Sequence, residues 1–234
     1  MMRIRRLFLV TLAIVLLSGC AQNPFAGQTT IDWIDFVKLN GKMYTGFREN
    51  VLRNPDDVMV EAIIGEVKFN VVKVSNKNYR TKNGDASYLT KGDKLYRVKG
   101  FKEKHLIAAE DDKSIGGYRL YAGESYETNL GLHYGELDMK KVDQVELYRQ
   151  NSLKPNKTLT GSEMDRFIQL LGSGTDQARY TPELNEGYPI TYTMVFYTEG
   201  PLGYAFYLFD DGTHVYLEHD QTRLFDQAIR TFLE

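Results

Sequence analysis

The sequence predicts an α+β protein: an N-terminal β-rich small barrel or sandwich, followed by a small antiparallel sheet covered by two helices. Three observations predict this class. Short stretches of alternating apolar and polar residues recur along the first half, with glycine-containing turns between them. Helical spacing of apolar residues occurs only after residue 150, beside further strand-like segments. Aromatic residues make up 12% of the chain and suit half-buried strands.

The first twenty residues have the pattern of an export signal. Three arginines precede an apolar run at 7–17, and two small residues follow before Cys20. The apolar run is shorter than the roughly 20 residues that a transmembrane helix needs. We therefore expect this segment to direct export and then to be removed.

The residues Leu17-Ser18-Gly19-Cys20 resemble the lipobox of bacterial lipoproteins. In that family the cysteine thiol receives a diacylglyceryl group, and a signal peptidase cuts before the cysteine. The resemblance implies lipidation of Cys20 and an anchor in the cell membrane, on its extracytoplasmic face, with fatty acids such as palmitate. Two acyl chains are enough for stable anchoring. An ordinary secretory signal and an uncleaved membrane anchor are the alternatives.

Cysteine use and charge exclude several classes of function. Cys20 is the only cysteine, so the rest of the chain cannot form a disulfide, a zinc–thiolate site or a cysteine nucleophile. The net charge is −2, and loss of the three arginines of the leader would leave −5. Such a charge argues against a nucleic-acid partner. The expected partners are the membrane, through the lipid anchor, and an envelope protein or wall component.

We expect four segments along the chain. They are a lipoprotein signal peptide at 1–19, a flexible tether at 20–30, a β-rich domain at 31–135 and an α+β domain at 140–234. The tether is polar, lacks periodicity and contains Pro24 and Gly27.

The β-rich domain is expected to begin with a hairpin. Asn40-Gly41 separates two alternating runs, and this dipeptide favours a type I′ turn because both of its residues can adopt positive φ. Residues 50–58, which include Pro55, indicate a loop or a single turn.

Further strands are expected after this loop. Residues 65–74 alternate as a half-buried strand, with Val67, Phe69 and Val71 on one face. Three short strands should follow at 94–101, 105–111 and 118–123.

The segment Gly84–Phe101 resembles a stretch found in lipoproteins of Bacillus-like bacteria. A "KG" turn precedes "LYRVKGF" in it, and the similarity extends over about 31–123. These motifs are typical of turns and a core. The resemblance implies an envelope protein and no particular activity.

The α+β domain is expected to contain a strand, a helix, three strands and a final helix. The first helix follows a cap at Thr160 or Ser162 and ends at Gly172. The final helix, 221–233, would be capped by Asp220 and carry one apolar stripe. The strands are expected at 142–150, 190–198, 203–209 and 214–218. The stripe consists of Leu224, Phe225, Ala228, Ile229 and Phe232.

One cluster could bind a metal ion, but turn and cap chemistry explains it better. It consists of Asp210, Asp211, His214, Glu218, His219 and Asp220. Asp211-Gly212 fits a hairpin turn, and strand alternation would place the two histidines on opposite faces. We therefore expect no metal and no cofactor.

No catalytic set is recognisable. The stretch 172–175 (GSGT) lacks the spacing of a nucleophile elbow, and 110–112 is typical of a charged turn. We expect a non-enzymatic, lipid-anchored envelope protein with a binding role. An envelope hydrolase with a dispersed site and an inhibitor-like module remain the alternatives.

Overall fold

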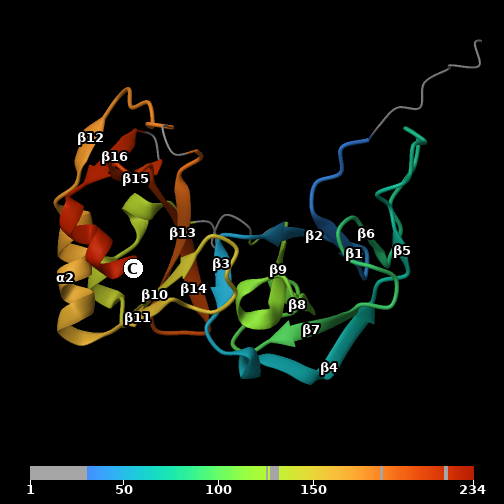
Figure 1. The fold of residues 1–234 in the computed structure, drawn as a ribbon. Helices are drawn as coiled ribbons and strands as arrows, with labels where there is room; N and C mark the ends of the chain where they lie inside the picture. The colour runs from blue at the N-terminus through green and yellow to red at the C-terminus, as the bar shows by residue number, and fades with distance from the viewer. Residues whose placement is uncertain (1–30, 125, 127–131, 185–186, 219–220) are drawn as a thin grey trace, which may run out of the picture. The chain divides into compact units, whose positions relative to one another are not determined.

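The computed structural model describes residues 31–124, 126, 132–184, 187–218 and 221–234 (Figure 1). Contacts divide the chain into two units, of which the larger comprises 33–72 and 81–234. All strands and helices below belong to this larger unit. Within the described residues, no helix is long and apolar enough to cross a membrane.

The first sheet has eight strands in the order β4-β7-β8-β9-β2-β1-β6-β5. Its strands are β1 (Phe36–Leu39), β2 (Lys42–Phe47), β4 (Val58–Glu66), β5 (Phe69–Asn70), β6 (Asp85–Ala86), β7 (Lys94–Val98), β8 (Leu106–Glu110) and β9 (Tyr118–Gly123). Neighbouring strands are antiparallel except β5 and β6, which are parallel.

The expected hairpin is confirmed. Leu39 of β1 pairs with Lys42 of β2, which leaves a two-residue turn. Asn40 has φ 50° and Gly41 has φ 77°, as a type I′ turn requires. The three strands expected at 94–123 are confirmed as β7, β8 and β9, each within three residues of its expected ends.

The single strand expected at 65–74 is wrong. Strand β4 ends at Glu66, and β5 has only two residues. The backbone N–H of Val67 donates to Asp93 O (2.9 Å), whereas that of Val71 donates to Ala86 O (2.9 Å). Both valines are buried, but Phe69 between them is 46% exposed. The alternating residues therefore bond to two different segments and do not form one continuous strand.

The second sheet is antiparallel throughout, in the order β11-β10-β13-β14-β15-β16-β12, and β3 also pairs with β14. Its strands are β3 (Asn50–Leu52), β10 (Gln144–Arg149), β11 (Lys157–Leu159), β12 (Thr175–Gln177), β13 (Ile190–Tyr197), β14 (Leu202–Asp210), β15 (Val215–Glu218) and β16 (Thr222–Phe225). The four strands expected in this half are confirmed as β10, β13, β14 and β15.

Helix α2 (Gly161–Gly172) confirms the first expected helix. Its buried residues are Met164, Phe167 and Leu171, and they belong to the hydrophobic core of the second sheet. Thr160 occupies the N-cap position, although its side chain makes no capping hydrogen bond. The chain also forms short 3₁₀ helices: η1 (Pro55–Asp57), η2 (Ile115–Gly117), η4 (Tyr134–Glu136), η5 (Met139–Lys141) and η6 (Gln227–Phe232).

The continuous final helix expected at 221–233 is wrong. Residues 222–225 form β16, which pairs with β15 and β12, and only 227–232 are helical, as η6. Asp226 caps η6 by accepting a hydrogen bond from the backbone N–H of Ala228 (2.8 Å). The expected cap, Asp220, lies outside the described residues. Ring centroids of Phe232 in η6 and Phe167 in α2 are 5.3 Å apart. The fold is thus α+β, with strands predominating.

Candidate functional site

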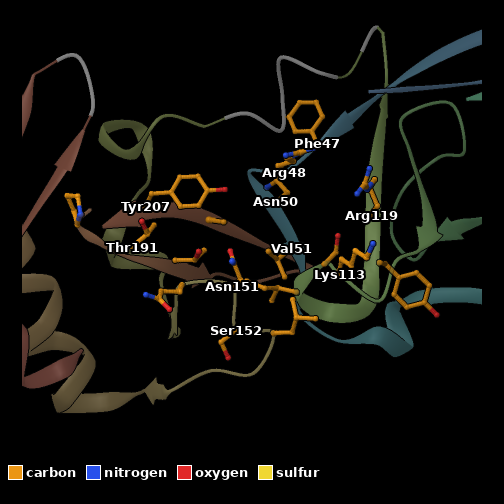
Figure 2. Close-up of a pocket in the computed structure, with 18 residues that line it drawn as sticks. Phe47, Arg48, Asn50, Val51, Lys113, Arg119, Asn151, Ser152, Thr191 and Tyr207 are labelled. Atoms are coloured by element: carbon orange, nitrogen blue, oxygen red, sulfur yellow. The ribbon is translucent and has the colours of Figure 1, made fainter. Parts of the chain in front are cut away.

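A cavity of about 770 Å³ adjoins β3 and forms the candidate functional site (Figure 2). Five separate stretches of the chain line it, at 47–51, 113–119, 150–153, 189–193 and 205–207. All of them lie in the larger contact unit. A volume of this size is typical of small-molecule sites.

Strand β3 forms one wall of the cavity through its pairing with β14. Val51 pairs with Gly203, and the backbone N–H of Ala205 donates to Glu49 O (2.8 Å). A Cβ at position 203 would lie 2.6 Å from Cε1 of Tyr197, closer than carbon atoms can approach. Glycine at position 203 therefore leaves room for the side chain of Tyr197 next to the β3–β14 pair.

The loop before β9 supplies a second wall. The Asp111 carboxylate accepts hydrogen bonds from Ser114 Oγ (2.7 Å) and from the backbone N–H of Lys113 (3.1 Å). Gly116, at φ 79°, lies so close to β3 that a Cβ there would be 2.9 Å from Leu52 O. These contacts hold Lys113 and Ser114 at the cavity.

Arg119 lines the cavity, but two carboxylates already neutralise its charge. Its Nη1 lies 3.1 Å from Asp35 Oδ2, and its Nη2 lies 2.9 Å from Asp111 Oδ2. Burial raises the pKa of Asp35 above its ordinary value, and the Arg119 charge opposes that shift only in part. Burial also acts to raise the pKa of Asp111, but hydrogen bonds from Ser114 and Lys113, with the Arg119 charge, outweigh burial and lower it.

Two further cations line the cavity with exposed side chains, Arg48 and Lys113. In the described part of the chain, neither side chain makes an ion pair or a side-chain hydrogen bond. The described lining contains no aspartate and no glutamate. These two positive charges are therefore uncompensated within the lining itself.

Neutral polar groups and aromatic rings complete the lining. The amides are those of Asn50, Gln150 and Asn151, the hydroxyls those of Ser114, Ser152, Thr191, Thr193 and Tyr207, and the other rings those of Phe47 and Tyr118. Tyr207 is 50% exposed, so its ring is open to a ligand. Asn50 is buried, and its Nδ2 donates to Gly203 O (3.3 Å). The cavity thus offers mainly hydrogen-bond donors and acceptors, positive charge and aromatic faces.

The described lining contains no histidine, carboxylate or thiol, and its two serines are engaged elsewhere. Ser114 Oγ donates to Asp111, and Ser152 Oγ donates to Lys154 O (2.6 Å). The Asp111 carboxylate beside Ser114 also pairs with Arg119 (2.9 Å), and its lowered pKa makes it a weak general base.

Asp210 and Asp211, the first two residues of the acidic cluster, form structural contacts. Asp210 forms a two-point ion pair with Arg230, at 2.9 Å to Nε and 2.7 Å to Nη2. Asp211 accepts hydrogen bonds from the Tyr180 hydroxyl and from the backbone N–H of His214 (2.7 Å). Burial acts to raise the pKa of Asp211, but these hydrogen bonds, with those of two more backbone N–H groups, outweigh it and lower the pKa.

Of the other residues of that cluster, the structure describes His214 and Glu218. Glu218 ends β15 and is exposed, and His214 Nδ1 lies 3.2 Å from the Tyr180 hydroxyl. His219 and Asp220 lie outside the described residues, as does Cys20. Within the described ranges, no group of three or more histidine, cysteine, aspartate or glutamate side chains could hold a metal ion.

A second cavity, of about 570 Å³, lies beside α2. Apolar side chains such as Leu137, Ile168 and Leu217 line it, together with the Arg223–Asp176 ion pair (2.9 Å). It has fewer polar groups than the cavity at β3, and its cation is already paired.

Sequence analysis did not predict the cavity at β3. Its residues come from stretches between Phe47 and Tyr207, and none of these stretches contains a recognisable motif. Comparison of the chain with protein-family models, with curated proteins and with solved structures found no match.

Proposed function

We propose that this chain is a lipid-anchored cell-envelope protein that binds a small polar ligand outside the cytoplasmic membrane, without catalysis. The observation that carries the proposal is the segment Leu17–Cys20, which follows a basic and apolar leader. The anchor would place the folded part close to the membrane, since the tether at 20–30 is short.

The lining of the cavity at β3 supports a binding role over hydrolysis. A dispersed hydrolase site would need an effective general base beside a nucleophile. The described lining has no histidine, and the carboxylate that accepts from Ser114, that of Asp111, is paired with Arg119 and has a lowered pKa, so it is a weak base. The volume and polarity of the cavity suit a small ligand held by several hydrogen bonds.

We also propose that the first sheet curls into a small barrel. Strands β4 and β5 stand at the two ends of its strand order, yet β5 begins only three residues after β4 ends. A chain segment this short brings the two end strands close together, as closure of a sheet requires.

The first prediction tests the anchor. The full chain, produced in a bacterial host and extracted from membranes, should begin at Cys20 and carry a diacylglyceryl group on the thiol. The Cys20→Ala variant should keep its leader and carry no lipid. Mass spectrometry of the N-terminal peptide measures both properties.

A Gln22→Ala variant serves as the control, because this residue lies just outside the lipobox-like segment. It should be cleaved and acylated like the parent chain. An unmodified thiol at Cys20 in the parent chain would overturn the lipid-anchor proposal.

A further inference from the structure

The described lining of the cavity at β3 is positively charged, whereas the chain as a whole has a net negative charge. The whole chain has 31 acidic and 29 basic residues, yet the described lining has three cations and no carboxylate. Arg119 is neutralised by Asp35 and Asp111, which approach it from outside the lining. Among the described residues Arg48 and Lys113 form no ion pair, although the Arg48 charge also acts on Asp35 by lowering its pKa. No carboxylate of the described lining faces these two cations, and they favour an anion in the cavity.

The neutral groups indicate what else the anion should carry. Asn151 and Thr191 contribute an amide and a hydroxyl group to the lining (Figure 2). Gln150 contributes a second amide to the same lining. Such groups can donate to and accept from the hydroxyls of a polyol or sugar. The half-exposed ring of Tyr207 offers an apolar face to the carbon skeleton of such a molecule.

The volume also favours a small organic anion over a bare inorganic ion. About 770 Å³ could hold a molecule of several carbon atoms together with the waters that bridge it to the wall. An inorganic ion alone would leave most of the amide and hydroxyl groups without a ligand contact.

We infer that the cavity at β3 binds a small anion that also carries hydroxyl groups, such as a phosphorylated polyol or a sugar acid. Arg48 and Lys113 pair with the anionic group, while Gln150, Asn151 and Thr191 recognise the hydroxyls. This inference rests on the small-ligand role proposed above and adds the chemical class of the ligand.

Calorimetric titration of the full chain in non-ionic detergent tests the inference. The anionic probes are glycerol 3-phosphate and glucuronate, and the matched neutral probes are glycerol and glucose. At least one anionic probe should bind in the millimolar range or tighter, and its neutral counterpart should bind at least tenfold more weakly. Which of the two anionic probes binds distinguishes phosphate from carboxylate recognition.

Two double variants test whether the anionic probe binds in the cavity at β3. The double variant Arg48→Gln/Lys113→Gln should weaken the anionic probe at least tenfold, because it removes the two lining cations that form no ion pair in the described part of the chain. The control, Lys99→Gln/Arg179→Gln, removes two exposed cations outside the lining and should leave affinity within twofold. Circular dichroism should show that both variants remain folded.

Three results would overturn the inference. They are no detectable binding of either anionic probe at about 10 mM, equal binding of the neutral probes, or equal weakening by the control variant. The state of Cys20 is read separately by mass spectrometry. A chain acylated at Cys20 that binds no anion would refute this inference alone, whereas an unmodified Cys20 would refute the anchor.

Discussion

At the scale of single residues, Gly203 shows how closely the side chains of neighbouring residues approach the backbone of β14. A Cβ at this position would lie 2.6 Å from Tyr197 Cε1 and 2.7 Å from Val195 Cγ1. Both neighbours are buried, so they have little freedom to move away. The side chain of residue 203 is therefore limited to a hydrogen atom by packing, without any need for a positive φ.

We predict that Gly203→Ala lowers the free energy of unfolding by about 1–3 kcal/mol, the usual cost of overpacking a well-filled core. Urea unfolding followed by circular dichroism measures the change. Gly172→Ala is the matched control, because a Cβ there would have no heavy atom within 4 Å. A Gly203→Ala protein as stable as the parent would contradict the packing argument.

At the scale of elements, strand β3 determines the position of the cavity. Leu52 of β3 is buried in the same cluster as Val98 of the first sheet and Leu202 of β14. Val51 is buried in a different cluster, with residues of β10, β13 and β14. This three-residue strand thus contributes to two hydrophobic clusters at once.

We predict that Leu52→Ala lowers the free energy of unfolding by about 2–5 kcal/mol, since the site is fully buried. Amide hydrogen exchange should show lost protection in both sheets, because the cluster joins residues of both. Leu184→Ala, at a leucine that is 56% exposed, should change the free energy by no more than about 0.5 kcal/mol. Protection lost in one sheet only would contradict the bridging role of β3.

Sequence analysis predicted the elements that carry a local sequence signal. It did not predict the elements whose position depends on pairing with a strand far away in the sequence. The Asn40-Gly41 turn and helix α2 carry their own signals, a dipeptide and an apolar stripe. Strand β3 has only three residues, and its position is set by pairing with β14, about 150 residues away. No local pattern encodes such a pairing.

The error at the C-terminus has a related cause. Leu224, Phe225, Ile229 and Phe232 have helical spacing, but Phe225, Ile229 and Phe232 are buried equally well by a strand followed by a 3₁₀ helix. Pairing of 222–225 with two strands satisfies their backbone groups without a helix. Apolar spacing over so short a stretch does not distinguish the two arrangements.

At the scale of the whole molecule, the candidate site exists only in the folded chain. Its cations come from the residue after β2, from the loop before β9 and from β9 itself, and its amides come mainly from the loop after β10. Sequence analysis found the residues with recognisable chemistry, such as Asp210 and Asp211, but the structure uses these in ion pairs and turns. Position in space, and not residue type, distinguishes Arg48 and Lys113 from the other cations of the chain.

The pH dependence of stability follows from carboxylates in different parts of this fold. The folded pKa of Asp211 lies below its ordinary value of 3.8, so the folded chain resists protonation there more than the unfolded chain does. Its contribution to stability is present above about pH 3.8 and is lost as the pH falls through the folded pKa. Asp111 acts in the same direction, whereas the raised pKa of Asp35 makes stability fall as the pH rises above 3.8.

We therefore predict that Asp211→Asn reduces the loss of stability in acid without abolishing it, since Asp111 still contributes. Urea unfolding at intervals from about pH 2 to about pH 5 measures the slope for the variant and the parent chain. The exposed Asp112, changed to asparagine, is the control and should keep the parental slope. An equally steep slope in Asp211→Asn would show that the hydrogen bonds from Tyr180 and His214 do not favour the charged carboxylate in the folded chain.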